Sequence, residues 1–280
     1  MNKQQLASTI WESANQMRSK IEANEYKDFI LGFIFYKYLS DKEVRFFADK
    51  GMSEEDMETL SESNKKQVEY AQRNLGYFIA YENLFSTWIG ANKDDDEGKK
   101  KTNFDVSNVR QALSAFDRLI GKSHKKLFKD IFKTLQTGLS KLGESATAQT
   151  KAINKLLKLI EKIPMDGKQD YDVLGFIYEY LISMFAANAG KKAGEFYTPH
   201  EVSLLMSEIV AWHLSGRKEI CIYDPTSGSG SLLINIGNSV TKFMDSNKVQ
   251  YFAQELKENT YNLTRMNLVM RGIEPRNKIG

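Results

Sequence analysis

The residues best suited to bind a ligand form a turn near the C-terminal end, Asp224-Pro225-Thr226-Ser227-Gly228-Ser229-Gly230. A short β-branched run ends at this turn, and an apolar helical pattern begins after it at Ser231. A strand, a glycine turn and a helix together bring backbone N–H groups and a helix N-terminus up to a ligand. The acid at the strand end suits a ligand with a positive group, such as the ammonium of S-adenosylmethionine.

The same turn lacks the features of the common phosphate-binding loops. A dinucleotide fingerprint needs a third glycine, and Leu233 stands at that position. A P-loop needs Gly-Lys-Ser/Thr after the turn, where this chain has Ser231-Leu232-Leu233. A phosphate cradle is therefore disfavoured.

A second acid, Glu255, follows the next predicted strand, 27 residues beyond Gly228. In nucleotide-type folds an acid at this place accepts hydrogen bonds from both ribose hydroxyls. An isolated glutamate here would be read as an exposed helix-capping carboxylate. Its spacing from the glycine turn favours the ribose interpretation.

A third candidate segment is Gly194-Glu195-Phe196-Tyr197-Thr198-Pro199. Helix capping explains Thr198, Pro199 and Glu201 but leaves the two aromatic residues unexplained. Adjacent aromatics in a glycine-flanked loop are often packing residues, although they can also wall a purine or sulfonium pocket.

The elements that must position these residues divide the chain in two. Helical periodicity extends over the first 165 residues, and Pro164, Asp166 and Gly167 then interrupt it. The remainder predicts helices at 171–187, 198–214, 230–243 and 258–270, and strands at 219–224 and 249–254. We therefore predict an α-helical N-terminal domain, residues 1–165, followed at 166–280 by the first half of a Rossmann-like α/β domain. Two strands are too few for a stable sheet of this kind, so we expect the chain to be a fragment of a longer protein.

Charge is distributed unevenly along the 280 residues. The net charge of +3 includes a segment, residues 99–168, with 16 basic and 6 acidic side chains. Two sets of lysines in this segment have helical spacing opposite an apolar face: Lys122, Lys126, Lys129 and Lys133, and Lys151, Lys155, Lys158 and Lys162. Such stripes are usually solvated faces, and the alternative is contact with DNA phosphates.

The cysteine, the apolar stretches and the histidines argue against a disulfide-bonded, a membrane-spanning and a metal-binding protein. A single cysteine, Cys221, excludes an internal disulfide, fits a reducing cytoplasm, and is predicted to be buried in its strand. The longest apolar stretch, residues 29–39, is too short to span a bilayer, so we expect no membrane association. The histidines, His124, His200 and His213, have no cysteine or acid arrangement typical of a metal site.

Three ordered blocks carry a family resemblance: Gly194 to Pro199, Asp224 to Gly230, and Gln254-Glu255 leading into Asn262-Leu263-x-x-Met266-Asn267-Leu268. Together they resemble the modification subunit of type I restriction–modification systems, a family of adenine-N6 DNA methyltransferases. The resemblance implies S-adenosylmethionine as cofactor, with Asp224, Ser227, Gly228, Ser229 and Gly230 at its methionine end. It also implies that Glu255 holds the ribose and that Glu195, Phe196, Tyr197, Thr198 and Pro199 close over the cofactor.

The resemblance implies partners as well: double-stranded DNA, a specificity subunit, a second modification subunit and a restriction subunit. One feature of the family is missing. Its catalytic signature is Asn or Asp followed by Pro-Pro and an aromatic residue, and none of the four prolines here is adjacent to another. We therefore assign no catalytic residue.

Two alternatives to a DNA-adenine methyltransferase stay open at this point. One is a non-catalytic module that docks to DNA and to the specificity subunit. The other is an RNA or protein methyltransferase with the same cofactor-binding half.

Overall fold

The computed structural model describes residues 3–17, 23–91, 104–165, 176–177, 180–181, 183–184, 198, 200–244 and 248–273. The chain forms two compact units, Met1–Leu181 and Ile182–Gly280. Among the described residues, no helix is both long and apolar enough to cross a membrane.

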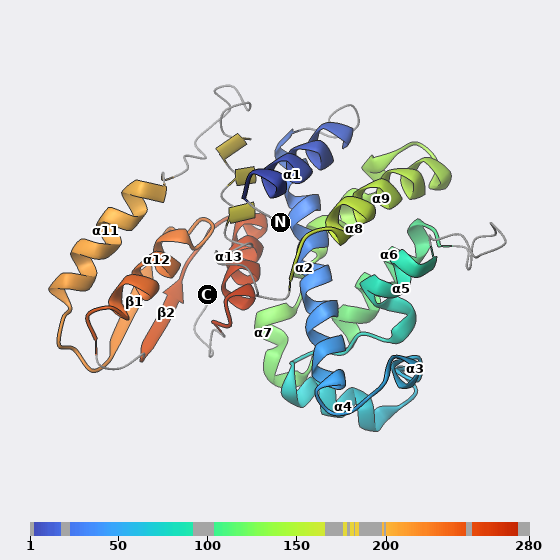
Figure 1. The fold of residues 1–280 in the computed structure, drawn as a ribbon, viewed down its shortest axis with the longest axis horizontal. Coiled ribbons are helices and arrows are strands. Elements are labelled where there is room, and N and C mark those ends of the chain that lie inside the picture. The colour runs from blue at the N-terminus through green and yellow to red at the C-terminus, as the bar shows by residue number, and fades with distance from the viewer. Residues whose placement is uncertain are drawn as a thin grey trace. The chain divides into compact units, whose positions relative to one another are not determined.

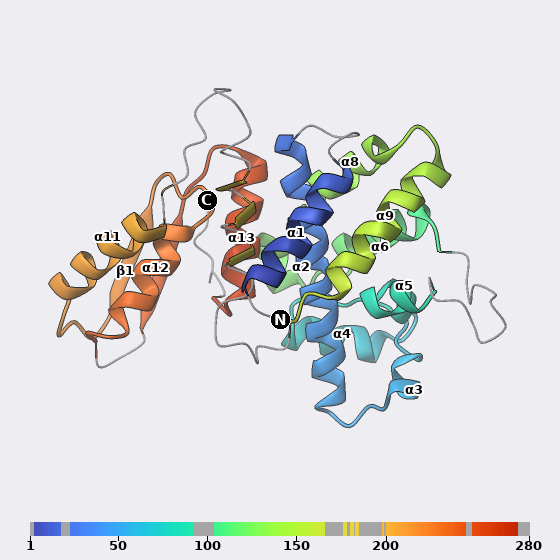
Figure 2. The same ribbon diagram turned by 45° about the horizontal axis from the view of Figure 1, so that its top comes forward.

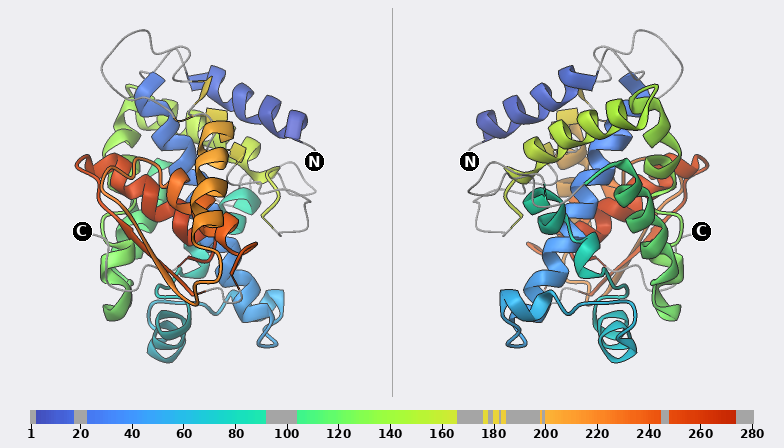
Figure 3. Two further views of the ribbon diagram at one scale, coloured as in Figure 1. Left: turned by 90° about the vertical axis from the view of Figure 1, so that its left-hand side faces the viewer. Right: turned by 90° about the vertical axis from the view of Figure 1, so that its right-hand side faces the viewer.

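The first unit is helical, as predicted, and is built around one long helix. Figures 1, 2 and 3 show α2 passing through the middle of this unit. Its buried aromatic side chains form ring pairs with neighbouring helices, such as Tyr36 with Trp88 at 4.8 Å between centroids. The described helices are α1 (Lys3–Met17), α2 (Ala23–Ala48), α3 (Glu54–Met57), α4 (Lys65–Asn74), α5 (Phe85–Ala91), α6 (Val106–Arg118), α7 (Lys125–Phe128), α8 (Lys133–Gly138) and α9 (Ala146–Glu161), with 3-10 turns at Tyr81–Asn83, Lys122–His124 and Leu139–Leu142.

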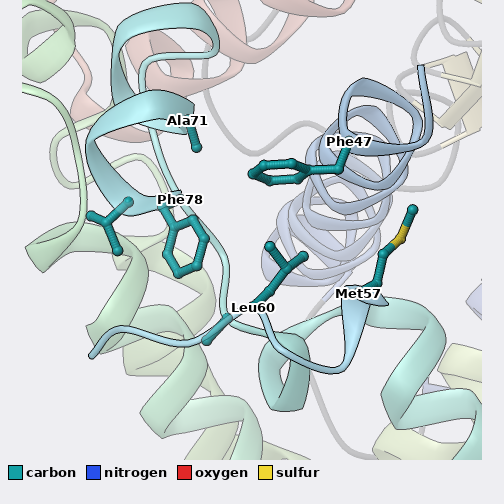
Figure 4. Close-up of a cluster of buried hydrophobic side chains, with 7 residues drawn as sticks. Phe47, Met57, Leu60, Ala71 and Phe78 are labelled. Carbon is teal, nitrogen blue, oxygen red and sulfur yellow. The ribbon is translucent and has the colours of Figure 1, made fainter. Parts of the chain in front are cut away.

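A small apolar cluster lies at the C-terminal end of α2 (Figure 4). Phe47 comes from α2 and Met57 from α3, and both lie against residues that follow along the chain. The sequence pair Ser53 and Asp56 predicts a capping box, and the structure has it at the start of the short helix α3, where each side chain bonds the other residue's backbone N–H. The buried members of the cluster are Phe47, Met57, Leu60, Val68, Ala71, Phe78 and Ala80.

The apolar periodicity of residues 127–135 predicts one amphipathic helix, and this prediction is wrong. Helix α7 ends at Phe128, and α8 begins only at Lys133. Between them Asp130 has φ 58°, in the left-handed region that stops a helix and that aspartate tolerates better than most residues. Ile131 and Phe132, which follow the break, are still buried. The apolar side chains of this segment therefore reach the core without a continuous helix.

This break also corrects the first lysine stripe. Lys126 lies on α7 and Lys133 opens α8, so the set from Lys122 to Lys133 does not follow a single helix, although all four side chains are exposed. By contrast, Lys151, Lys155 and Lys158 lie on one continuous helix, α9, and are exposed opposite its buried apolar face.

The second unit has the predicted strand and helix order: α11 (His200–His213), β1 (Ile220–Asp224), α12 (Ser231–Val240), β2 (Val249–Ala253) and α13 (Glu258–Met270). The strands β1 and β2 pair in parallel, with Ile220 opposite Val249 and Asp224 opposite Ala253. A parallel pair joined by a helix is the unit from which a Rossmann-type sheet is built. The predicted fold class, a helical region followed by a methyltransferase-like α/β region, is confirmed.

The two faces of this sheet differ. Ile220 and Ile222 are buried in a cluster with residues of α11, α12 and β2. Cys221 and Tyr223 point to the opposite face and are exposed, so the prediction that Cys221 is buried is wrong. That prediction assumed that other elements pack on both faces of the sheet. In the structure only the face with Ile220 and Ile222 is covered, so alternate residues of β1 are exposed.

Candidate functional site

Two carboxylates lie at the neighbouring C-terminal ends of the parallel strands. Asp224 is the last residue of β1, and Glu255 follows β2 by two residues. Backbone bonds continue past the strands and hold the two ends together. The Gln254 N–H donates to the Asp224 carbonyl at 2.9 Å, and the Ser227 N–H donates to the Gln254 carbonyl at 2.9 Å. The spacing seen in the sequence therefore becomes a single edge of the sheet.

Glu255 is tied to the glycine turn itself. Its Oε2 accepts the Gly228 N–H at 3.1 Å, and its Oε1 accepts the Lys257 N–H at 3.0 Å. The residue is partly exposed, and each carboxylate oxygen has a second lone pair available for a further donor. The carboxylate can thus hold the turn in place and still accept hydrogen bonds from a pair of ligand hydroxyls.

Asp224 organises the start of the turn. Its Oδ1 accepts the Thr226 N–H at 3.0 Å, which closes a local loop of the kind aspartate favours in turns. Next to it, the Tyr223 hydroxyl donates to Gln254 Oε1 at 2.7 Å, across to the segment after β2. The Asp224 side chain is partly exposed, so a cationic group of a ligand can reach it.

The two glycines of the turn serve different purposes. Gly228 has φ 55°, and a Cβ built on it would find no atom nearer than 4.0 Å, so the backbone is open to a close approach there. Gly230 has φ 79°, and its Cβ would lie 3.2 Å from Thr264 Cγ2. As the N-cap of α12, Gly230 has no side chain to bond the first N–H groups of that helix, which leaves them to other acceptors.

The other side of the turn is held by α13. Thr264 Oγ1 donates to the Gly228 carbonyl at 2.6 Å, and Asn267 Nδ2 donates to the Ser229 carbonyl at 2.9 Å. Both side chains are buried, at 0% and 1% exposure. With these two carbonyls bonded to α13, the peptide groups of the turn have a fixed orientation.

Sequence reasoning did not assign Thr264 or Asn267 to the site. The available signal was two polar residues three apart, which share one helix face, within a helix that buries most of its residues. Asn267 belonged to the motif that carried the family resemblance, but nothing in the sequence showed which backbone group it would bond.

Of the remaining predicted site residues, the structure describes Thr198, Ser227 and Ser229. Thr198 is described, in irregular structure and partly buried. Glu195, Phe196, Tyr197 and Pro199 lie outside the described residues, so their closure over a cofactor stays a prediction. Ser227 is buried against Thr264, with 3.4 Å between the hydroxyl oxygens, and the hydroxyl of Ser229 lies 2.8 Å from that of Ser231.

Comparison with known protein families assigns both parts of the chain. Residues 6–163 match the family model described as HsdM N-terminal domain, and residues 169–279 match the model described as N-6 DNA Methylase. The chain belongs to the modification subunits of type I restriction–modification systems. This family assignment confirms the resemblance seen in the sequence.

Individual relatives agree. The chain is 31% identical over 275 residues to the Type I restriction enzyme MpnII methylase subunit of Mycoplasma pneumoniae, covering 95% of this chain and 50% of that protein. It is 24% identical over 279 residues to the MjaIX methylase subunit of Methanocaldococcus jannaschii, covering 95% and 45%. The chain thus spans about half the length of these relatives.

A solved structure gives the same assignment. The methyltransferase subunit of the type I restriction–modification system from Streptococcus thermophilus superposes with a TM-score of 0.78 at 31% identity. The superposition covers 99% of this chain and 58% of the other.

Proposed function

We propose that this chain is the cofactor-binding part of a DNA-adenine methyltransferase that binds S-adenosylmethionine at the turn Asp224–Gly230. The observation that carries the proposal is the shared edge at which Asp224, the Gly228 backbone and Glu255 meet. S-adenosylmethionine supplies a methyl group activated by its sulfonium. Asp224 is suited to the methionine ammonium, and Glu255 to the two ribose hydroxyls.

The residues of the chain fit this ligand. Two carboxylates match one cationic group and one diol, and the open backbone at Gly228 allows the close approach that a ligand at a strand end requires. The turn positions the methyl donor but does not act on the adenine. Adenine N6 is paired inside the duplex, so the base must be flipped out before a methyl group can reach it.

These 280 residues contain no Asn/Asp-Pro-Pro-aromatic signature, since the prolines are Pro164, Pro199, Pro225 and Pro275. The groups that stabilise the adenine amine are therefore not assigned to this chain. The second candidate function is a non-catalytic module that assembles the complex and docks to DNA.

For the domains we propose that residues 1–165 contact DNA and partner subunits, with Lys122, Lys126, Lys129 and Lys133 among the DNA contacts. Residues 166–280 form the cofactor-binding half of the catalytic domain. We also propose that the protein acts in the cytoplasm, in a complex with a specificity subunit, a second modification subunit and a restriction subunit. Membership of the family supports this proposal.

Calorimetric titration with S-adenosylmethionine tests the cofactor site. We expect Glu255→Ala to weaken binding by about 1–3 kcal/mol, because hydroxyl partners lose their acceptor. Glu219→Ala is the matched control. Glu219 bonds Gln250 across the opposite end of the same strand pair, at 2.6 Å, so its loss should leave the affinity unchanged. If the unsubstituted chain does not bind the cofactor, the assignment of the turn is wrong; equal binding by the Glu255 variant would remove only that residue.

Transfer of a tritiated methyl group to target DNA, with the specificity subunit present, separates the two candidate functions. Incorporation by these 280 residues would support the enzyme. Cofactor binding without incorporation would support the module for this chain.

A further inference from the structure

Two asparagines of the segment after Glu255 have a common pattern that the proposed cofactor site does not explain. Asn262 and Asn267 belong to the block that carries the family resemblance, and both are buried on α13, at 3% and 1% exposure. Each accepts a hydrogen bond through Oδ1 from an arginine three or four residues later on the same helix face: Arg265 bonds Asn262, and Arg271 bonds Asn267.

The pair of Arg271 and Asn267 fixes the orientation of a buried amide. A guanidinium has donors and no acceptor, so the Asn267 oxygen must face Arg271 and the Asn267 nitrogen must face away from it. Arg271 Nη1 also donates to the Asn267 backbone carbonyl at 3.2 Å, which ties the guanidinium to the same residue. The Asn267 nitrogen then donates to the Ser229 carbonyl at 2.9 Å. A reversed amide would leave two donors facing each other at Arg271 and two acceptors facing each other at Ser229.

The end of α13 places Arg271 for this task. Arg271 is the C-cap of the helix, and Gly272 follows it in the left-handed region at φ 69°. The Ile273 N–H bonds the Leu268 carbonyl at 3.0 Å, which is the ending of a helix that a glycine at this position favours. Because helical side chains lean toward the N-terminus of their helix, an arginine four residues after Asn267 reaches back over it.

The Ser229 carbonyl belongs to the peptide group that leads from the glycine turn into α12. The N–H of the same peptide, that of Gly230, donates to the Ser227 carbonyl at 2.7 Å. In a planar trans peptide the carbonyl and the N–H point in opposite directions, so the bonds to Asn267 and Ser227 together hold the plane of this peptide. Gly230 is the N-cap of α12. The orientation of the peptide therefore sets how the helix leaves the turn.

We propose that Arg271 is a positioning residue of the turn Asp224–Gly230, and that it acts through the Asn267 amide on the peptide between Ser229 and Gly230. The arginine holds the amide in one orientation, the amide holds the peptide, and the turn keeps the shape in which it binds S-adenosylmethionine. The effect on cofactor affinity rests on the proposed function. The hydrogen bonding of the turn is measurable without any ligand, so the two proposals can fail separately.

Hydrogen exchange of the Gly230 amide, measured by nuclear magnetic resonance without cofactor, tests the proposal directly. Arg271→Met keeps the aliphatic stem and removes the donors, so the Asn267 amide is free to turn away from the Ser229 carbonyl. We expect the Gly230 amide to exchange about tenfold faster in this variant, because its peptide loses one of the two bonds that hold it. Arg271→Lys should restore most of the protection, since an ammonium also only donates.

Arg73→Met is the matched control for the loss of an arginine. Arg73 is exposed on α4 and donates to the backbone carbonyl of Glu69, four residues earlier, at 3.3 Å. It thus makes the same kind of bond within a helix, away from Asn267. The control variant should leave the exchange of Gly230 unchanged.

Calorimetric titration with S-adenosylmethionine measures the consequence for the site. We expect Arg271→Met to weaken binding about fivefold, the size of effect that one hydrogen bond normally has. In an Asn267→Leu background the same substitution should have no further effect on affinity, because the amide through which Arg271 acts is gone. An arginine that only stabilises α13 would lower affinity equally in both backgrounds.

A measurement on the unsubstituted protein needs no variant to fold. With labelled asparagine, the side-chain amide protons of Asn267 should exchange at least about tenfold more slowly than those of Asn238, which is exposed on α12. Equal exchange of the two amides would overturn the proposal. So would unchanged Gly230 exchange in Arg271→Met, or faster exchange with unchanged cofactor affinity. Failure of the unsubstituted protein to bind the cofactor, with the exchange results as expected, would reject the proposed function and leave the role of Arg271 in the turn supported.

Discussion

At the scale of single residues, Glu255 performs two tasks with one carboxylate. It accepts the Gly228 and Lys257 N–H groups, which shapes the turn, and it keeps lone pairs for further donors. A ribose bound there would therefore meet an acceptor that the fold has already oriented. Preorganisation of this kind lowers the entropic cost of binding.

Another carboxyl, Glu43 in α2, is fully buried and has no proposed part in binding. Its oxygens accept the Ile79 N–H at 2.9 and 3.1 Å. Burial raises the pKa of Glu43 well above its ordinary value, and the bond from Ile79 lowers it only in part. The folded protein therefore holds this proton at a pH where the unfolded chain has lost it.

This pKa makes stability depend on pH. Below the ordinary glutamate pKa both states are protonated and Glu43 contributes no pH dependence. As pH rises above that value the unfolded chain ionises first, and the free energy of unfolding falls by up to about 1.4 kcal/mol per pH unit. We expect Glu43→Gln to remove this fall, so the variant gains stability relative to the unsubstituted protein as pH rises.

Urea unfolding between about pH 5 and pH 8 measures the effect. The exposed Glu55→Gln serves as control and should leave the pH dependence unchanged. A difference between the Glu43 variant and the unsubstituted protein that stays constant across this range would show that Glu43 ionises normally in the folded state.

At the scale of elements, the glycine turn depends on α13. Thr264→Val keeps the shape of the side chain but leaves the partly buried Gly228 carbonyl without its donor, at a cost of about 1–3 kcal/mol in unfolding free energy. Because Gly228 also donates its N–H to Glu255, displacement of this residue would disturb the proposed site, and we expect S-adenosylmethionine affinity to fall as well. Thr264→Ser restores the hydroxyl and should recover the affinity.

Thr241→Val is a matched control for this experiment. The Thr241 hydroxyl also donates to a backbone carbonyl, that of Asn238 at 2.7 Å, but at the exposed end of α12. Calorimetry on all three variants distinguishes a positioning role from general stability. If Thr264→Val loses stability yet binds the cofactor as before, α13 supports the fold without setting the geometry of the turn.

At the scale of the whole molecule, charge separates along the chain. Residues 1–98 carry 12 basic and 18 acidic side chains, whereas residues 99–168 carry 16 and 6. A basic segment of this size is suited to contact with phosphates, and binding that releases counterions weakens as salt is added.

Reversal of Lys126 and Lys129 to glutamate should lower DNA affinity and flatten its salt dependence. If both lysines contact phosphates, the slope of log K against log salt should fall in magnitude by about two. The matched control reverses Lys65 and Lys66, which are exposed on α4 in the acidic segment. Fluorescence anisotropy over a range of salt concentrations measures the DNA affinity and the slope for each variant. An unchanged slope would identify Lys126 and Lys129 as ordinary surface residues.

The sequence by itself determined the order of the described strands and helices in the second unit, the class of fold and the family. Local signals sufficed for these, because a capping pair such as Ser53 and Asp56, or a turn such as Asp224–Gly230, acts on its own neighbours along the chain. The helix 258–270 was predicted with its observed bounds for the same reason.

Only the tertiary structure decided which groups bond across the chain and which faces are covered. The bonds from Thr264 and Asn267 to the turn span 36 and 38 residues, and no local pattern specifies them. The break at Asp130 and the exposure of Cys221 likewise follow from how much cover neighbouring elements provide. Burial and long-range hydrogen bonding depend on the position of every surrounding element, whereas helix and strand periodicity depends on the segment alone.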